Sequence, residues 1–199
     1  MKRLLTLIPS LVVCIGAANA GTINTYSSES AFLSAVYPGY YEETFSANNS
    51  GLSLSYSGNG YAYTVSDSYG LQTSYGWLQT IMAGDTITIT ITSGTVTAVG
   101  ADFFAVNALA QPRATNITLT FSDGTIKTIA STTSTTTFTG YSFDRPITKL
   151  TIVPQSTLLA PRAAALDDLV FGTALPEPGT WILFSGGMGL LAFVKFRRR

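Results

Sequence analysis

An unbroken alternation of threonine and isoleucine covers residues 86–92. A period of two places the three isoleucines on one face of a strand and the threonines on the other. The turn formers Gly84-Asp85 precede this run, and Ser93-Gly94 follow it. The pattern predicts a strand over 86–92 whose isoleucines face a hydrophobic core.

Other short segments show the same β-type pattern and are bounded by Gly, Pro, Asn, Asp or Ser. A hairpin turn is predicted at 122–125 and a short helix at 27–36, with Ser28 as its N-cap. The Ser/Thr run 131–137 fits a strand or its flanking loop better than a disordered stretch, because threonine favours strands. Strands are predicted over 40–45, 52–56, 61–65, 77–82, 95–104, 116–121, 126–129, 138–143, 147–153 and 165–172.

About ten short strands with almost no helix predict an all-β fold. We expect one domain over residues 21–174, an antiparallel β-sandwich that is jelly-roll-like. The sequence contains no repeat of fixed period, which weakens the alternative of a parallel β-solenoid.

The N-terminus has the layout of a secretory signal peptide, predicted over residues 1–20. Lys2-Arg3 precede a mostly apolar segment, and Ala18 and Ala20 form a small-x-small cleavage site. This assigns the Sec machinery and signal peptidase as processing partners. Cys14 is the only cysteine and lies in the signal, so the mature chain has none.

The C-terminus carries an uncharged apolar segment from Trp181 to Val194, predicted to be a single hydrophobic helix. Its 14 residues would reach about 21 Å, against a bilayer core of about 30 Å, so it is a marginal span. The cations Lys195, Arg197, Arg198 and Arg199 follow at once and argue against a buried core helix. By the positive-inside rule they stay in the cytoplasm, and the body lies outside the inner membrane.

A short polar motif, Pro176-Glu177-Pro178, precedes this helix and is followed by Gly-Thr-Trp. Together with the apolar helix and the arginine cluster, it resembles a PEP-CTERM sorting signal of Gram-negative bacteria, over 175–199. The resemblance implies that an exosortase-type transpeptidase recognises the motif and cleaves near it. It also implies export from an inner-membrane precursor to the cell surface or extracellular matrix. Proteins with this signal are typically linked to exopolysaccharide and biofilm.

Charge and composition then narrow the function of the body. It carries five basic and ten acidic residues, so it has no footprint for nucleic acid. The chain has no histidine and no mature cysteine, which excludes Ser-His and Cys-His catalysis and Cys/His zinc sites. We expect a non-catalytic surface protein that binds polysaccharide. The alternatives are a glycan-active enzyme with two carboxylates and a purely structural surface protein.

Two sets of residues are candidates for binding. The first and last strands of a jelly roll often lie side by side, so carboxylates on them are candidates for a structural Ca²⁺ site; the alternative is that they face solvent or cap strand ends. Exposed aromatic rings can stack on sugars, although strand tyrosines are more often core residues. The calcium candidates are Glu42, Glu43, Asp167 and Asp168, and the ligand candidates are Tyr61, Tyr69 and Trp77.

Overall fold

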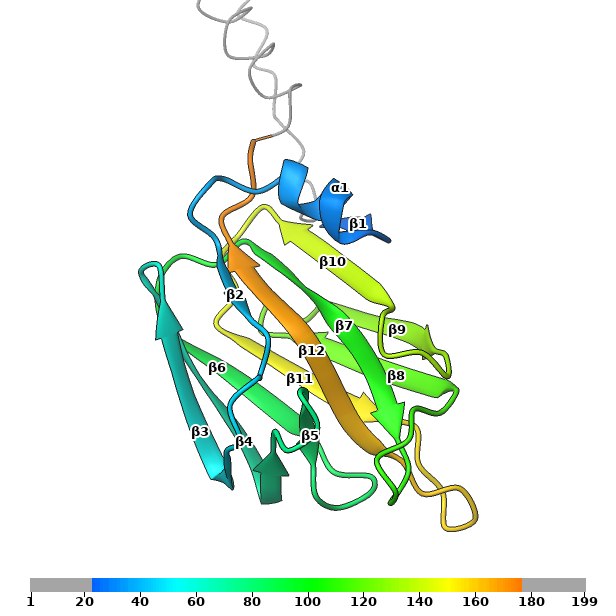
Figure 1. Cartoon of the computed structure of the whole chain (residues 1–199). Coiled ribbons are helices and arrows are strands. Elements are labelled where there is room, and N and C mark those ends of the chain that lie inside the picture. Colours follow the sequence, from blue (N-terminus) through cyan, green and yellow to red (C-terminus); the bar gives the residue numbers. More distant parts are fainter. Residues whose placement is uncertain (1–22, 177–199) are drawn as a thin grey trace, which may run out of the picture.

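The computed structural model describes residues 23–176, and strands make up most of this body (Figure 1). One short helix, α1 (Glu29–Ser34), follows the first strand, β1 (Ile23–Tyr26). The remaining strands, in chain order, are β2 (Tyr41–Glu43), β3 (Ser50–Gly58), β4 (Tyr61–Gln72), β5 (Leu78–Thr80), β6 (Ile87–Ser93), β7 (Ala98–Val106), β8 (Thr115–Phe121), β9 (Ile126–Ser131), β10 (Phe138–Phe143), β11 (Lys149–Pro154) and β12 (Ala163–Gly172).

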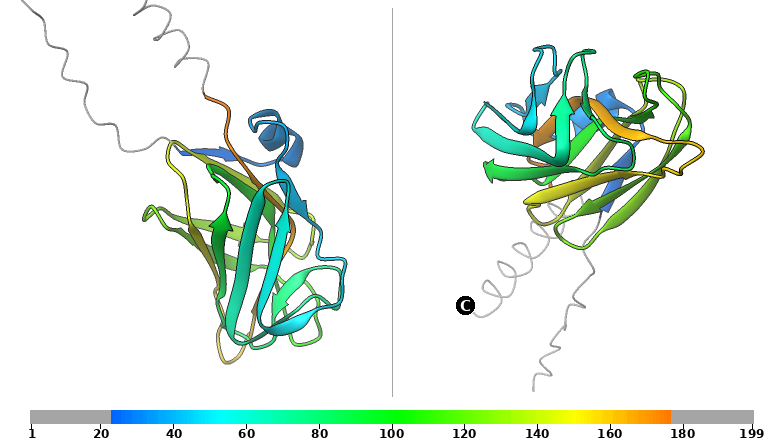
Figure 2. Two further views of the ribbon diagram at one scale, coloured as in Figure 1. Left: turned by 90° about the vertical axis from the view of Figure 1, so that its left-hand side faces the viewer. Right: turned by 90° about the horizontal axis from the view of Figure 1, so that it is seen from below.

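The strands form one 12-stranded sheet in the order β1-β10-β7-β12-β5-β4-β6-β11-β8-β9. In addition, β2 pairs with β12 and β3 pairs with β4. The short β5 pairs with both β12 and β4, and so links two halves that face each other (Figure 2). The prediction of an antiparallel all-β fold is confirmed, but the two layers belong to one curled sheet. The jelly-roll class stays a prediction.

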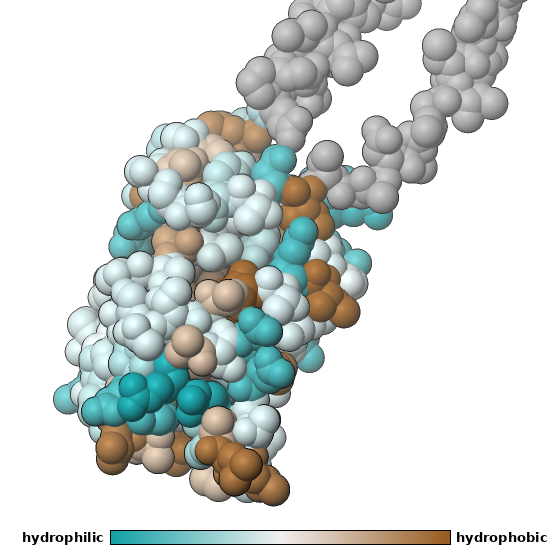
Figure 3. All heavy atoms as spheres, turned by 90° about the vertical axis from the view of Figure 1, so that its right-hand side faces the viewer, coloured by the Kyte–Doolittle hydropathy of each residue, from teal (hydrophilic) through white to brown (hydrophobic). Residues whose placement is uncertain are grey.

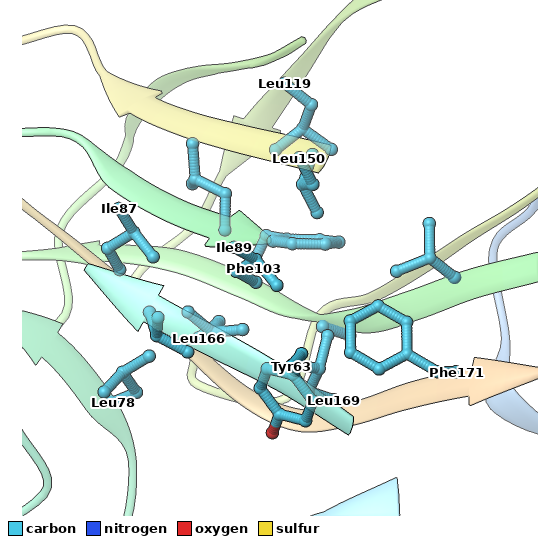
Figure 4. Packing of buried hydrophobic residues seen from close by; sticks show 14 of the residues in the cluster. Tyr63, Leu78, Ile87, Ile89, Phe103, Leu119, Leu150, Leu166, Leu169 and Phe171 are labelled. Atoms are coloured by element: carbon cyan, nitrogen blue, oxygen red, sulfur yellow. The ribbon is translucent and has the colours of Figure 1, made fainter. Parts of the chain in front are cut away.

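The main core fills the space between the two halves, and Figure 4 shows 14 of its side chains, ten of them labelled. Ile87 and Ile89 are fully buried there, as the alternation in β6 predicts, and Ile91 packs against the core at its edge. Facing them are Phe103 of β7 and Leu166 of β12. Burial of each such side chain stabilises the fold by about 1.5–3 kcal/mol, so this cluster holds together a body that contains no cysteine.

The strand β7 is buried on both faces along its whole length. Its outer face is covered at one end by α1, whose Phe32 is fully buried, and at the other end by Trp77. Ser28 caps α1 as predicted, and its hydroxyl accepts a hydrogen bond of 3.4 Å from the Ala31 amide. The central pair β7–β12 therefore lies inside a three-layered region of the molecule.

Most of the predicted strands occur close to their expected positions, and the hairpin between β8 and β9 is confirmed. The first strand, β1, was not predicted. The Ser/Thr run continues β9 only at Ser131 and then forms a loop, in which Thr132 and Thr137 hydroxyls lie 3.3 Å apart. The interpretation of this run as ordered structure is confirmed.

The end of β12 leads directly to the C-terminal segment. Ala174 forms a β-bridge with Val36, and the Leu175 amide donates to the Ala35 carbonyl at 2.8 Å. Pro176 is exposed and is the last residue described. The signal peptide with Ala18 and Ala20, and the tail with Glu177, Pro178, Trp181, Val194, Lys195, Arg197, Arg198 and Arg199, lie outside the described residues. Between residues 23 and 176, no helix is long and apolar enough to cross a bilayer.

Candidate functional site

The calcium candidates lie on two neighbouring strands, as predicted. Leu169 of β12 is opposite Glu43 of β2, and Val170 is opposite Glu42. Alternation sends the two glutamates to opposite faces of the sheet. Glu42 faces outward, where Glu29 and Asp168 add to its burial in raising its carboxyl pKa. Glu43 faces the same way as buried Tyr41, whose hydroxyl donates to Glu43 Oε2 at 2.5 Å.

The outer face also holds a carboxylate that sequence analysis missed. Asp102 of β7 is directly opposite Asp167 of β12, and only 6% of its surface is exposed. Just after Asp167 the register of β12 shifts, and Asp168 adopts a positive φ of 47° in this bulge. The Asp168 amide donates to Asp167 Oδ1 at 2.9 Å. The chain thus places a buried carboxylate against a strained turn that bears two more.

Burial and nearby negative charges raise the pKa values of Asp102 and Asp167, so that both lose their protons only at a higher pH than usual. Desolvation raises the pKa of Asp102 to about 7, with further contributions from Asp168, Asp167 and Glu29. Desolvation also raises the pKa of Asp167 to about 6, and Asp168 and Glu43 add to the shift, although the Asp168 amide opposes it. No basic residue contributes to either pKa. Each carboxyl group therefore keeps its proton to a higher pH than an exposed aspartate does.

As they stand, no three potential ligands from Asp, Glu, His or Cys lie close enough to hold a metal ion within residues 23–176. Asp102, Asp167 and Asp168 lie on one face, whereas Glu43 points to the tyrosines. Calcium binding therefore stays a prediction, with Asp102 as a ligand candidate in place of Glu43. The sequence would have indicated a buried Asp102 only if it had shown that both faces of β7 are covered.

Glu43 belongs to an aromatic cluster at the edge of the main core. Tyr56 and Tyr63 stack with ring centroids 5.3 Å apart, and Tyr41 meets Tyr63 edge-on at 5.8 Å. Glu43 accepts from Tyr41 and, at 3.0 Å, from the Phe45 amide. The buried Tyr63 and Tyr56 hydroxyls make no hydrogen bond of good geometry among the described residues, although Tyr41 and Asn49, respectively, lie near enough to affect their pKa values. Desolvation is the main cause of the raised pKa of both, to about 12 for Tyr56.

The two kinds of tyrosine in this cluster are expected to respond oppositely to loss of the hydroxyl. Tyr63→Phe removes a buried hydroxyl that makes no hydrogen bond of good geometry among the described residues, so we expect the free energy of unfolding to rise by about 1 kcal/mol. Tyr41→Phe removes the donor to a carboxylate and is expected to lower it by about 1–2 kcal/mol. Urea denaturation of both variants measures the difference. A lower midpoint for Tyr63→Phe would contradict the assignment of its hydroxyl as lacking a good hydrogen bond.

The aromatic ligand candidates do not form one surface. Tyr61 lies at the start of β4, and its hydroxyl is 3.4 Å from Thr173 Oγ1, near the exit of the tail. Trp77 precedes β5, near the opposite end of β4, and packs edge-on against Phe104 at 5.5 Å. Tyr69 is 67% exposed. The ring of Trp77 also stacks on Tyr75, which is not among the ligand candidates from the sequence.

Two solved structures are similar to the body of the chain, and a family model matches its tail. A family two carbohydrate esterase from Cellvibrio japonicus aligns over 79% of this chain, with 14% identity and a TM-score of 0.35. The chain spans only 36% of that protein. A CBM22-1 xylan-binding domain from Paenibacillus barcinonensis aligns over 81% of this chain and 100% of its own length, with 14% identity and a TM-score of 0.30. No curated protein matches the chain.

The tail gives the specific result. Residues 174–199 match the model of the PEP-CTERM protein-sorting motif. This confirms the resemblance found in the sequence and marks an exported protein that an exosortase sorts, with a C-terminal membrane anchor before processing. The chain carries a PEP-CTERM protein-sorting motif that begins where its β-sheet body ends.

Proposed function

We propose that this chain is a non-catalytic protein of the cell surface or extracellular matrix, and that its body binds polysaccharide after an exosortase has processed the tail. The observation that carries the proposal is the position of the sorting motif relative to the fold. The last contacts of the body are made by Ala174 and Leu175, and Pro176 is exposed immediately after them. Cleavage near the motif would therefore leave the hydrogen bonds of β12 intact.

Removal of the Pro-Glu-Pro motif tests the sorting step. With Pro176, Glu177 and Pro178 all changed to alanine, we expect the precursor to keep its tail and to remain in the inner membrane. The native chain should appear as a shorter product at the surface or in the medium. Immunoblotting of cell fractions and the intact mass of the product distinguish the two.

Thr180→Ser is the matched control, because it changes the tail outside the motif. It should be processed like the native chain. If the triple variant also loses its tail and reaches the same fraction as the native chain, the motif does not direct sorting and the proposal fails.

A glycan-active enzyme is the second candidate function, and the Asp102–Asp167 pair favours it. A carboxyl group whose pKa is raised to about 7 can keep its proton near neutral pH, as a general acid in glycoside hydrolysis must. Incubation with the producing bacterium's exopolysaccharide distinguishes the two functions. Retention without release of reducing ends supports a binding protein, whereas release that is lost in Asp102→Asn supports the enzyme.

A further inference from the structure

A small hollow lies beside β5, near the end of the body opposite the tail. Its volume is about 100 Å³, and its walls come from β5, the loop after β7 and the start of β12. Ala165 and Leu166, near the start of β12, pair with β5, whereas Gly172 at the other end of β12 leads to the tail (Figure 1). The hollow therefore lies at the end of β12 opposite to the end that continues into Leu175 and Pro176.

The walls of the hollow are polar but uncharged. They include Gln72, Gln79, Asn107, Thr80 and Tyr75, with isoleucine, alanine and proline between them. Within residues 23–176, no Asp, Glu, Lys or Arg lines it. Amides both donate and accept hydrogen bonds, which suits a ligand with hydroxyl groups and without net charge.

Gln79 lines this hollow, and its side-chain amide is held in one orientation. Its side chain is only 5% exposed, and its Oε1 accepts a hydrogen bond of 2.8 Å from Trp77 Nε1. An indole nitrogen can only donate, so the amide orientation of Gln79 is determined by chemistry. Its Nε2 makes no hydrogen bond to another described residue. A buried amide held in this way can donate to a ligand with little loss of conformational entropy.

An aromatic platform stands beside this donor. The Tyr75 ring stacks on Trp77 with centroids 5.6 Å apart and planes 22° apart, and Trp77 rests on Phe104. One face of Tyr75 is thus covered, while 53% of its surface stays exposed. Gly76, with a φ of 83°, allows the turn that brings the two rings together. An exposed ring face binds the apolar face of a sugar, and hydroxyl groups at the edge of the sugar bond to neighbouring amides.

The size of the hollow limits what it can hold. At about 100 Å³ it is smaller than the roughly 300–1,000 Å³ of pockets that enclose a whole small molecule. It can take one edge of a sugar whose ring lies on Tyr75, leaving the glycosidic oxygens outside. Leu109, Leu158 and Leu159 expose apolar surface on the loops around it, and Figure 3 shows apolar side chains gathered at this end. Such a shallow site fits one unit within a longer chain.

We propose that this hollow binds one unit of an uncharged polysaccharide, with Tyr75 as the stacking platform and Gln79 Nε2 as the hydrogen-bond donor. This inference rests on the proposed polysaccharide-binding function and names its site. The net negative charge of the body, together with the absence of cations from the walls, disfavours acidic polysaccharides.

Affinity electrophoresis of the purified full-length chain in detergent tests the site. The probes are soluble xylan, mixed-linkage glucan, galactomannan and the neutral fraction of the producing bacterium's own exopolysaccharide, with alginate as an acidic comparison. We expect at least one neutral probe to retard the chain more than alginate does. Tyr75→Ala should weaken this retardation about tenfold, which corresponds to about 1.4 kcal/mol, and Tyr75→Phe should restore it. Gln79→Leu should weaken it as well.

Tyr37→Ala is the matched control, because Tyr37 is also an exposed tyrosine (43%, against 53% for Tyr75) and lies outside the hollow. It should leave retardation unchanged, and thermal melts should show that Tyr75→Ala is folded. If a neutral probe binds equally well to Tyr75→Ala, the inference is wrong and polysaccharide binding is located elsewhere. If no neutral probe retards the native chain, both the site and the polysaccharide-binding function are wrong, whereas the processing of the tail is judged separately by its own variants.

Discussion

Asp102→Asn is expected to raise the free energy of unfolding at pH 8 by about 3 kcal/mol. The pKa of Asp102 is about 7 in the folded protein, against 3.8 ordinarily, and each unit corresponds to about 1.4 kcal/mol. The full shift would correspond to about 4 kcal/mol, and the expected gain is smaller because the neighbouring Asp167 and Asp168 are partly exposed and solvent screens part of the repulsion. Asparagine keeps the shape of the side chain and removes its charge. The substitution therefore removes a penalty that the native chain carries above neutral pH.

The gain in stability from Asp102→Asn should depend on pH and be larger at pH 8 than at pH 5. Because the folded-state pKa is raised, the folded protein binds more protons than the unfolded chain between about pH 4 and 7. The native chain should thus be most stable near pH 4 with respect to this group and lose stability as the pH rises to about 7. Asp102→Asn should flatten that slope. Urea denaturation in EDTA at pH 5 and pH 8 measures it, with exposed Asp144→Asn as the control. An equal gain at both pH values would contradict the prediction.

Bound calcium would neutralise the same carboxylates and so offset the loss of stability that their charges cause above neutral pH. If the ion binds between the outer carboxylates, added Ca²⁺ should raise the melting midpoint of the native chain at pH 8, and EDTA should lower it. The response should be lost in Asp102→Asn and Asp168→Asn. If neither Ca²⁺ nor EDTA changes the melting midpoint, the calcium hypothesis is wrong.

Phe32→Ala is expected to lower the free energy of unfolding by about 3–4 kcal/mol. Phe32 is fully buried under α1, where it meets Tyr26 edge-on at 5.6 Å and Phe138 at 5.5 Å. A large-to-small change at such a position loses burial and leaves a cavity. The ring also occupies the space above Gly140, since a Cβ there would lie 2.5 Å from Phe32 Cδ2. Truncation therefore removes the contact that docks α1 on the sheet.

Chemical denaturation measures this loss, and Ser30→Ala provides the control on the exposed side of the same helix. The control should stay within about 0.5 kcal/mol of the native chain. A loss below about 1 kcal/mol for Phe32→Ala would mean that α1 contributes little to the fold.

Period-two patterning predicted the strands that have one buried and one exposed face. In β6 the isoleucines face the core and the threonines do not, so the sequence contains the whole signal. A strand was also predicted over 95–104, but not one buried on both faces, because the cover that α1 and Trp77 give to the second face of β7 leaves no alternation to read. Those contacts join residues far apart in the chain, and no local pattern encodes them. Strand β1 is only four residues long, too short for a periodic signal.

For the candidate site, the sequence predicted which strands pair but not which side chains face inward. Pairing of an early strand with β12 was expected, and β2 provides it. Adjacent glutamates on a strand must face opposite sides, but Glu42-Glu43 alone does not say which one is inside. The answer depends on Tyr41, whose hydroxyl reaches Glu43. Asp102 was missed for the related reason that its partner, Asp167, is 65 positions away in the sequence.

The position of β12 also determines how the body would bear mechanical load before the tail is cut. The tail continues from β12, which is flanked by β7 on one side and by β2 and β5 on the other. A pull on the anchor acts along this strand, whereas its hydrogen bonds run across it. Many bonds must then shear together, instead of opening one by one as they would at an edge strand. The precursor is thus held at the membrane through one of the strands best able to resist flow at the cell surface.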